Sequence, residues 1–187
     1  MVSIERHFVI AALAAGVACA QAGAALVQFM HTFVNTSGTA QDFTFTATSD
    51  VAYSGQSLFD IQGSLALNLI DLNGNGASVG TTGLPMYVAS IGVASPTTVQ
   101  TIWNEPWSFA VGIYGNGVPP DQLFAATNVP VTPEAVQPLT ITIRLRLSAR
   151  DMVTVSGTFQ AVPVPAPGAI ALLAAAGVSG VGRRRQR

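Results

Sequence analysis

One cluster of aromatic and polar residues has the composition of a sugar-binding surface. Trp103, Glu105 and Trp107 lie within one short segment, and Tyr114 follows soon after. Flat aromatic faces can stack on sugar rings while neighbouring polar groups hydrogen-bond to the sugar hydroxyls. The competing interpretation places Trp107 in a protein core beside Phe109 and leaves Trp103 at the edge of that core. The core interpretation is favoured, and a carbohydrate-binding module that uses Trp103, Glu105, Trp107 and Tyr114 is the alternative.

A second segment contains the first half of a calcium-binding loop. Asp71, Asn73 and Asn75 carry oxygen side chains at every second position, and Gly76 follows where such a loop needs its sharp turn. The place of the usual bidentate carboxylate is taken by Thr82. A tight turn built on Asn-Gly dipeptides explains the same residues. We therefore expect no metal, with Asp71, Asn73 and Asn75 as the candidate for calcium.

The residues expected of a catalytic or cofactor-binding centre are sparse. Cys19 is the only cysteine, and His31 is the one histidine between residues 25 and 161. A zinc site would then have to rely on carboxylates, and no G-x-S-x-G motif is present to place a nucleophilic serine. Most acidic residues fall near the ends of expected strands, where solvated turn residues are common. We predict a protein that is not an enzyme and takes no cofactor.

Charge is distributed unevenly along the chain. There is no lysine, and four of the eight arginines lie in the last five positions. Residues 25–161 carry three arginines against eight carboxylates, a net charge of −5. This balance argues against nucleic acid as a partner, because little positive charge is present to neutralise phosphates. Arg144 and Arg146 alternate along one segment and are expected to face an acidic neighbouring strand.

The elements that position these residues follow from a hydrophobic period of two between residues 25 and 161. The clearest strand spans Leu139–Leu147, in which every second residue is leucine or isoleucine. About eight such strands with frequent turn signals predict an all-β fold, an antiparallel β-sandwich. Hairpin-like connections are expected at 35–38, after Asp71 and at 115–117, with a further turn at 148–151. Other strands are expected near 26–34, 43–48, 65–69, 87–93, 99–103, 107–113, 122–127 and 152–161.

The N-terminus has the organisation of a secretory signal peptide. Arg6 precedes an uncharged apolar stretch at 8–18, and small residues after it offer cleavage sites of the A-x-A kind. We assign residues 1–24 to a signal peptide with a helical apolar core. If cleavage follows Ala20 or a later residue, the mature protein contains no cysteine.

The C-terminus has three parts in a fixed order. Prolines recur at alternate positions up to Pro167, an uncharged stretch covers 168–182, and an arginine cluster begins at Arg183. As a helix, the uncharged stretch would be roughly 22 Å long, at 1.5 Å per residue, and short for a membrane core of about 30 Å. The basic end would stay in the cytoplasm by the positive-inside rule. We assign 162–187 to a sorting and anchor segment with a C-terminal transmembrane helix, after a sandwich domain at 25–161.

This tail resembles the PEP-CTERM sorting signal of proteins processed by exosortases in Gram-negative bacteria. The residues that carry the resemblance are Pro165, Ala166, Pro167 and the cluster Arg183, Arg184, Arg185. Ala166 stands where the family usually has glutamate, so the motif is of a VPAPG type. A plain tail anchor without processing is the other interpretation.

The resemblance implies an exported protein that begins as an inner-membrane precursor and reaches the cell envelope, cell surface or extracellular matrix. It also implies an exosortase-like membrane enzyme as a partner and a setting near exopolysaccharide. Together with the sparse chemistry of the body, it predicts a non-enzymatic protein of structural or adhesive type, with polysaccharide as the other expected partner.

Overall fold

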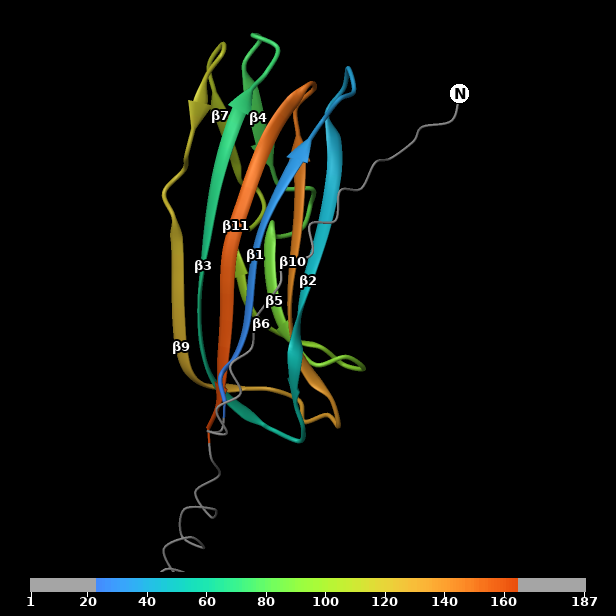
Figure 1. The fold of residues 1–187 in the computed structure, drawn as a ribbon, viewed down its shortest axis with the longest axis vertical. Coiled ribbons are helices and arrows are strands. Elements are labelled where there is room, and N and C mark those ends of the chain that lie inside the picture. The colour runs from blue at the N-terminus through green and yellow to red at the C-terminus, as the bar shows by residue number, and fades with distance from the viewer. Residues whose placement is uncertain (1–22, 165–187) are drawn as a thin grey trace, which may run out of the picture.

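The computed structural model describes residues 23–164, whose regular structure consists of β-strands (Figure 1). Across this range, no helix has the length and hydropathy required to cross a membrane. The predicted all-β class is therefore confirmed for the body of the protein. The signal peptide expected at 1–24, the transmembrane helix, the proline motif and the arginine cluster lie outside the described residues, apart from the two residues that precede Ala25.

Eleven strands are present in the described part of the chain. They are β1 (Ala25–Val34), β2 (Gln41–Tyr53), β3 (Leu58–Asp71), β4 (Ala77–Gly80), β5 (Tyr87–Ile91), β6 (Thr97–Ile102), β7 (Ser108–Val111), β8 (Asn116–Gly117), β9 (Gln122–Pro130), β10 (Gln137–Leu147) and β11 (Asp151–Pro163).

The strands form two antiparallel sheets that make a β-sandwich (Figure 1). The first sheet has the order β1-β11-β3, with β9 and β8 beside different parts of β3. In the second sheet, β10 lies between β2 on one side and both β5 and β4 on the other, and β6 and β7 complete the outer edge. Because β4 with β5, β6 with β7, and β8 with β9 each share one position, eleven strands fill about the predicted number of places.

Numbered in chain order, these places run 1-8-3-6 in the first sheet and 2-7-4-5 in the second. This is the strand order of a jelly roll, a sandwich built from two Greek keys. Apart from β5–β6, successive places lie in opposite sheets. The turns at 35–38, 71–76 and 148–151 therefore cross between sheets, which corrects the hairpin-like interpretation. The third expected turn, at 115–117, is mostly strand β8, and the crossing there is made by residues 112–115. Turn-forming residues mark where a chain reverses, but they do not specify the sheet in which the next strand pairs.

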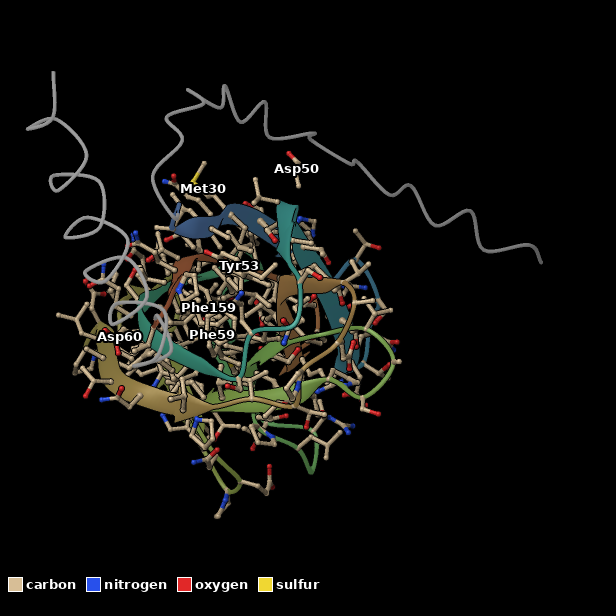
Figure 2. All side chains as sticks on the ribbon, turned by 90° about the horizontal axis from the view of Figure 1, so that it is seen from below. Met30, Asp50, Tyr53, Phe59, Asp60 and Phe159 are labelled. Carbon is tan, nitrogen blue, oxygen red and sulfur yellow. The ribbon has the colours of Figure 1, made fainter. Side chains whose placement is uncertain are left out.

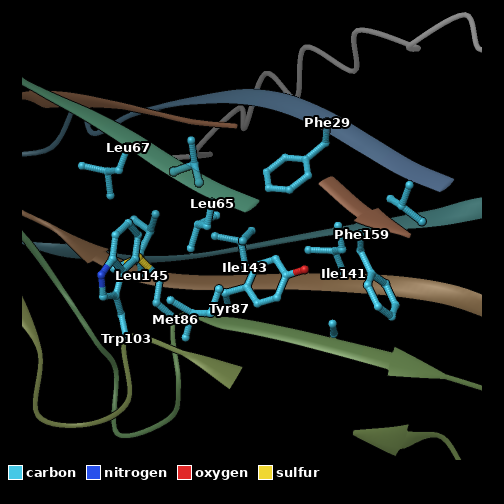
Figure 3. Packing of buried hydrophobic residues seen from close by; sticks show 14 of the residues in the cluster. Phe29, Leu65, Leu67, Met86, Tyr87, Trp103, Ile141, Ile143, Leu145 and Phe159 are labelled. Carbon is cyan, nitrogen blue, oxygen red and sulfur yellow. The ribbon is translucent and has the colours of Figure 1, made fainter. Parts of the chain in front are cut away.

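The alternation along β10 accounts for most of the core. Its leucine and isoleucine side chains are fully buried, while Thr140, Thr142, Arg144 and Arg146 lie on the outer face. The strand packs across the sandwich from β11 and β3, whose apolar residues alternate in the same way. Figure 3 shows Tyr87, Phe159, Leu65 and Ile143 directed into the space between the two layers. The predicted strand at 139–147 and its buried face are thus confirmed.

One edge of the sandwich is held together by a tyrosine. The hydroxyl of Tyr53, on β2, accepts a hydrogen bond from the backbone N–H of Ala25 and lies 2.7 Å from the carbonyl oxygens of both Gly23 and Ala161. Tyr53 therefore links the second sheet to two strands of the first. Viewed from below, Tyr53 lies toward the interior near Phe59 and Phe159, whereas Met30 and Asp50 point outward (Figure 2).

Two short strands were absent from the sequence-based expectation. β4 follows directly on the glycine-rich loop, and β8 consists of two residues, so neither has enough alternation to be recognised. The strand expected at 107–113 is also shorter than predicted. It ends at Val111, and Ile113 is 70% exposed on the following loop.

Candidate functional site

The two tryptophans stack on each other. Their ring centroids are 4.4 Å apart, and the ring planes are inclined by 16°. Trp103 follows β6 with a left-handed backbone (φ 49°) and is 8% exposed, among the buried residues of the core. Trp107 precedes β7 and is partly buried against the same core. The indole faces thus contact each other instead of forming a paired platform that is open to solvent.

The structure brings together only part of the proposed sugar-binding set. Glu105 lies in the loop between the two tryptophans, and its Oε2 accepts a hydrogen bond of 3.3 Å from the backbone N–H of Gly83. Tyr114 lies beyond the far end of β7, 77% exposed, with its ring against Gly74. Tyr114 therefore belongs to a different loop cluster, and carbohydrate binding by the four residues together stays a prediction that this geometry does not favour.

The calcium candidate is organised around the carboxylate of Asp71. One oxygen, Oδ1, accepts the backbone N–H groups of Asn73 and Gly74 at 3.1 and 3.0 Å. The other, Oδ2, accepts those of Gly76 and Tyr114 at 2.9 and 2.7 Å. Burial alone would raise the pKa of Asp71, but these four N–H donors stabilise the charged form and lower it to about 2.

The side chain of Asn73, the second calcium candidate, is engaged in contacts within the loop and with a neighbouring turn. The side-chain oxygen of Asn73 accepts the backbone N–H of Asn75, and its amide group donates to the carbonyl of Ala149. Among the described residues, no cluster of three or more histidine, cysteine or carboxylate side chains is arranged to hold a metal ion. Asp71 therefore has a structural explanation: through the hydrogen bonds of its carboxylate it joins the β3–β4 connection to the loop after β7.

Glu134 performs a similar task at the opposite end of the sandwich. Its carboxylate accepts the backbone N–H groups of Val93, Ala94 and Ser95 at 2.7, 3.1 and 2.6 Å. The bonds from Val93 and Ser95 make the largest contributions to lowering its pKa. The sequence offered no signal for this contact, because Glu134 and the loop at 92–96 are distant in the chain. Asn35 and Gln137 are two further buried polar residues, and their burial has no signal in the sequence.

His31 lies in an aromatic row at the open edge between β1 and β2. Its ring stacks on Phe45 with centroids 4.5 Å apart, and it meets Phe33 edge-on at 4.6 Å. Burial lowers its pKa below the ordinary value. These contacts agree with a structural role for the histidine.

The outer face of the second sheet contains an open groove of about 320 Å³, which we term the β10 groove. Arg146 on this face has an ion pair with Asp42 at 3.7 Å, as expected for an acidic neighbouring strand, and among residues 23–164 it is the one arginine of the two that is so paired. Arg144 lies half-buried at the groove. The sequence placed both arginines on one face but could not reveal the hollow beside them. The groove is lined by Val88, Ser90, Gly92, Pro96, Thr98, Thr140, Thr142 and Arg144.

A second depression, of about 400 Å³, lies beside β3, β9 and β11. Its polar side chains engage one another or the backbone. Gln62 donates to the side-chain oxygen of Gln160 at 2.5 Å, and Asp60 accepts the backbone N–H of Asn128 at 2.9 Å. With its main polar groups already paired, this depression is a weaker candidate than the β10 groove.

Comparisons with known proteins assign neither a family nor an activity. No family model matches the chain, and no curated protein matches it significantly. Among solved structures, it is similar to that of the infectious bursal disease virus Gx strain, with 13% identity over 74% of this chain and 31% of that one, at a TM-score of 0.34. For the Gt strain, the identity is 12% over 74% of this chain and 41% of that one, at a TM-score of 0.26. The chain thus spans about a third of the first structure, and such distant likenesses assign no activity.

Proposed function

We propose that this protein is an exported, non-enzymatic component of the cell envelope or extracellular matrix, of structural or adhesive type. A C-terminal signal of the PEP-CTERM kind delivers it in a bacterium of Gram-negative type. The precursor is anchored in the inner membrane by the apolar segment, with the arginine cluster in the cytoplasm. An exosortase-like membrane enzyme then acts near Pro165–Pro167 and removes the tail.

One structural relationship supports this proposal above the others. The last strand, β11, lies between β1 and β3 in the first sheet and ends at Pro163, just before the motif begins at Pro165. The backbone N–H of Val164 still donates to the carbonyl of Leu58 at 3.0 Å. Cleavage at the motif would therefore release all eleven strands together, with no part of the core lost.

The chemistry of the carboxylates also supports a structural role. Asp71 and Glu134 hold loops through backbone N–H groups, and Asp42 pairs with Arg146. Each of these acidic side chains has an assigned contact that stabilises a turn or an edge strand. Hydroxyl and amide pairs cover the outer face of the first sheet, where Thr32 meets Thr154 and Ser64 meets Thr158, each at 2.9 Å. Such a face suits contact with a hydrated polysaccharide matrix.

The proposal is tested by following the tail in cells that carry an exosortase-like enzyme and in matched cells from which it has been deleted. We expect the protein in the first cells to lose its tail and leave the inner-membrane fraction. In the deletion cells, it should keep the tail and remain with that membrane. A variant with Arg183, Arg184 and Arg185 changed to glutamine should be sorted poorly, whereas Arg150→Gln, in the sandwich, should be sorted normally. Identical fractionation in both cell types would contradict the proposal.

A further inference from the structure

The β10 groove has a floor of hydroxyl groups in register. Thr140 of β10 lies opposite Ser90 of β5, which in turn lies opposite Thr98 of β6. The next row begins with Thr142, which lies opposite Val88. Neighbouring strands are roughly 4.8 Å apart, and alternate residues on one strand are roughly 6.7 Å apart. The pairing of β5 with β6 shifts between Ala89 and Ser90, so the rows are not strictly periodic. The floor nevertheless places the hydroxyl groups of Thr140, Ser90 and Thr98 on neighbouring strands, with Thr142 one step along β10.

Arg144 follows Thr142 at the next outward-facing position of β10. It is the charged residue in the lining of the groove. Its neighbour on the adjacent strand β2 is Thr44, whereas Arg146 has Asp42 opposite it. Within residues 23–164, no carboxylate is paired with Arg144, and none lines the groove. A guanidinium group presents a planar pair of N–H donors that matches a carboxylate. The groove thus combines a site for a carboxylate with a row of hydroxyls.

The loop that forms one wall of the groove is held in place by Glu134. Gly92 and Pro96 belong to the loop whose N–H groups at Val93, Ala94 and Ser95 are bound by Glu134. Gly92 itself has a φ of 108°, a conformation that residues with a Cβ rarely adopt. A fixed wall lowers the entropy that must be lost when a ligand binds.

We infer that the β10 groove binds a uronic acid unit of an acidic polysaccharide. The carboxylate of the sugar pairs with Arg144, its hydroxyls exchange hydrogen bonds with Thr140, Thr142 and neighbouring hydroxyls, and its C–H face lies on Val88 and Pro96. The volume of about 320 Å³ lies in the range of small-molecule sites, roughly 300–1,000 Å³. This inference deepens the proposed function and rests on it for the setting in which the protein meets polysaccharide.

The attraction between the groove and an acidic sugar comes from Arg144 and not from the charge of the whole domain. Residues 23–164 contain three arginines and eight carboxylates, so the domain has a net negative charge that repels polyanions. Added salt screens this long-range repulsion more than the close pair at Arg144. The affinity for an acidic oligosaccharide should therefore hold or rise between low and physiological salt, the opposite of binding to a basic patch.

The test is calorimetric titration of the full chain, in a neutral detergent, with oligogalacturonate and with oligomannuronate. The methyl ester of each oligosaccharide is the matched neutral probe. We expect binding of at least one acidic oligosaccharide, with its methyl ester weaker by about tenfold or more. Arg144→Gln should weaken binding by about tenfold or more, because a charge-assisted pair is lost.

Arg146→Gln is the matched control, because it removes an equal charge from the same face of the strand. Unlike Arg144, Arg146 is already paired with Asp42. The control substitution should change the affinity by less than about twofold. Thr142→Val keeps the shape of the side chain and removes one hydroxyl, so it probes the floor even if Arg144→Gln fails to fold. The inference is overturned if neither acidic oligosaccharide binds, if the methyl ester binds equally well, or if Arg146→Gln weakens binding as much as Arg144→Gln.

The outcomes for the groove and for the sorting proposal are separable. Loss of binding in the titration, with the tail still removed in cells, would overturn the groove alone. Retention of the tail in cells, with binding intact in the titration, would overturn the sorting proposal alone.

Discussion

Trp103 and Trp107 lie face to face, with ring centroids 4.4 Å apart and planes inclined by 16°. The pair joins the end of β6 to the start of β7, and Trp103 faces the core with Met86 and Leu145 nearby (Figure 3). A surface that stacks on sugars must expose an aromatic face, whereas here each indole covers the other. The pair is therefore best understood as part of the packing that connects the two edge strands.

This placement makes stability the property most sensitive to Trp103. Trp103→Ala removes a buried ring and should lower the free energy of unfolding by about 3 kcal/mol. Trp107→Ala should cost clearly less, because Trp107 is only partly buried. Urea unfolding followed by circular dichroism measures both effects. Equal stabilities of the wild type and Trp103→Ala would contradict the assignment of Trp103 to the core.

Two tyrosine hydroxyls should have opposite effects on stability. The hydroxyl of Tyr53 bonds to backbone groups of β1 and β11, two neighbouring strands of the first sheet, so Tyr53→Phe should destabilise the protein by about 1 kcal/mol. The hydroxyl of Tyr87 is buried without a hydrogen-bond partner among the described residues, and burial raises its pKa. Tyr87→Phe should therefore stabilise the protein, by about 1 kcal/mol. Thermal melting of the two variants gives the sign of each change in stability. A change of the same sign in both variants would contradict the roles given to the two hydroxyls.

Asp71 should make stability depend on pH in the acid range. Its pKa is lowered from 3.8 to about 2 in the folded protein, so the unfolded chain binds a proton first as the pH falls. The stabilisation is complete above pH 3.8 and is lost progressively as the pH falls toward about 2. Glu134, whose pKa is also lowered, contributes with the same sign. In Asp71→Asn, the loss of stability on acidification should be smaller than in the wild type. An identical acid profile in urea unfolding would show that the N–H contacts do not stabilise the charged carboxylate.

Gly63 lies where a side chain has no room. A Cβ at this position would overlap the ring of Phe124 and the carbonyl oxygen of Thr158, and the carbonyl belongs to the backbone of β11. Gly63→Ala should therefore destabilise the sandwich by about 2 kcal/mol through overpacking. Gly38→Ala is the matched control, because a Cβ there meets nothing within 4 Å. If both variants melt at the same temperature, β3 and β9 do not pack as closely as described.

The sequence was sufficient to predict the strands with strong alternation. Leu139 and Ile141 alternate with threonines, and this period of two is the direct consequence of a sheet with one buried face. The burial of such side chains could be inferred without knowing the partner strand. An acidic partner for Arg146 could be predicted as well, because an exposed basic strand favours an acidic neighbour, and Asp42 is that partner.

The order of the strands in the sheets and the groove on the outer face could not be predicted from the sequence. The jelly-roll order depends on pairings such as Gly63 with Phe159, which are nearly a hundred positions apart in the chain. Glu134 reaches the loop at 92–96 only because β10 pairs with β5 in the second sheet, and the wall of the β10 groove includes that loop. Local propensity carries no information about these distant partners.

The central claim, that the tail is a processed sorting signal after a complete sandwich, is tested most directly by the intact mass of the mature protein. The protein would be purified from the cells that make it naturally, and its C-terminal residue would be assigned by mass spectrometry. The account predicts a C-terminus near Pro165–Pro167, with every strand through Pro163 retained. A mature protein that still carries Arg183–Arg187 at steady state would contradict it.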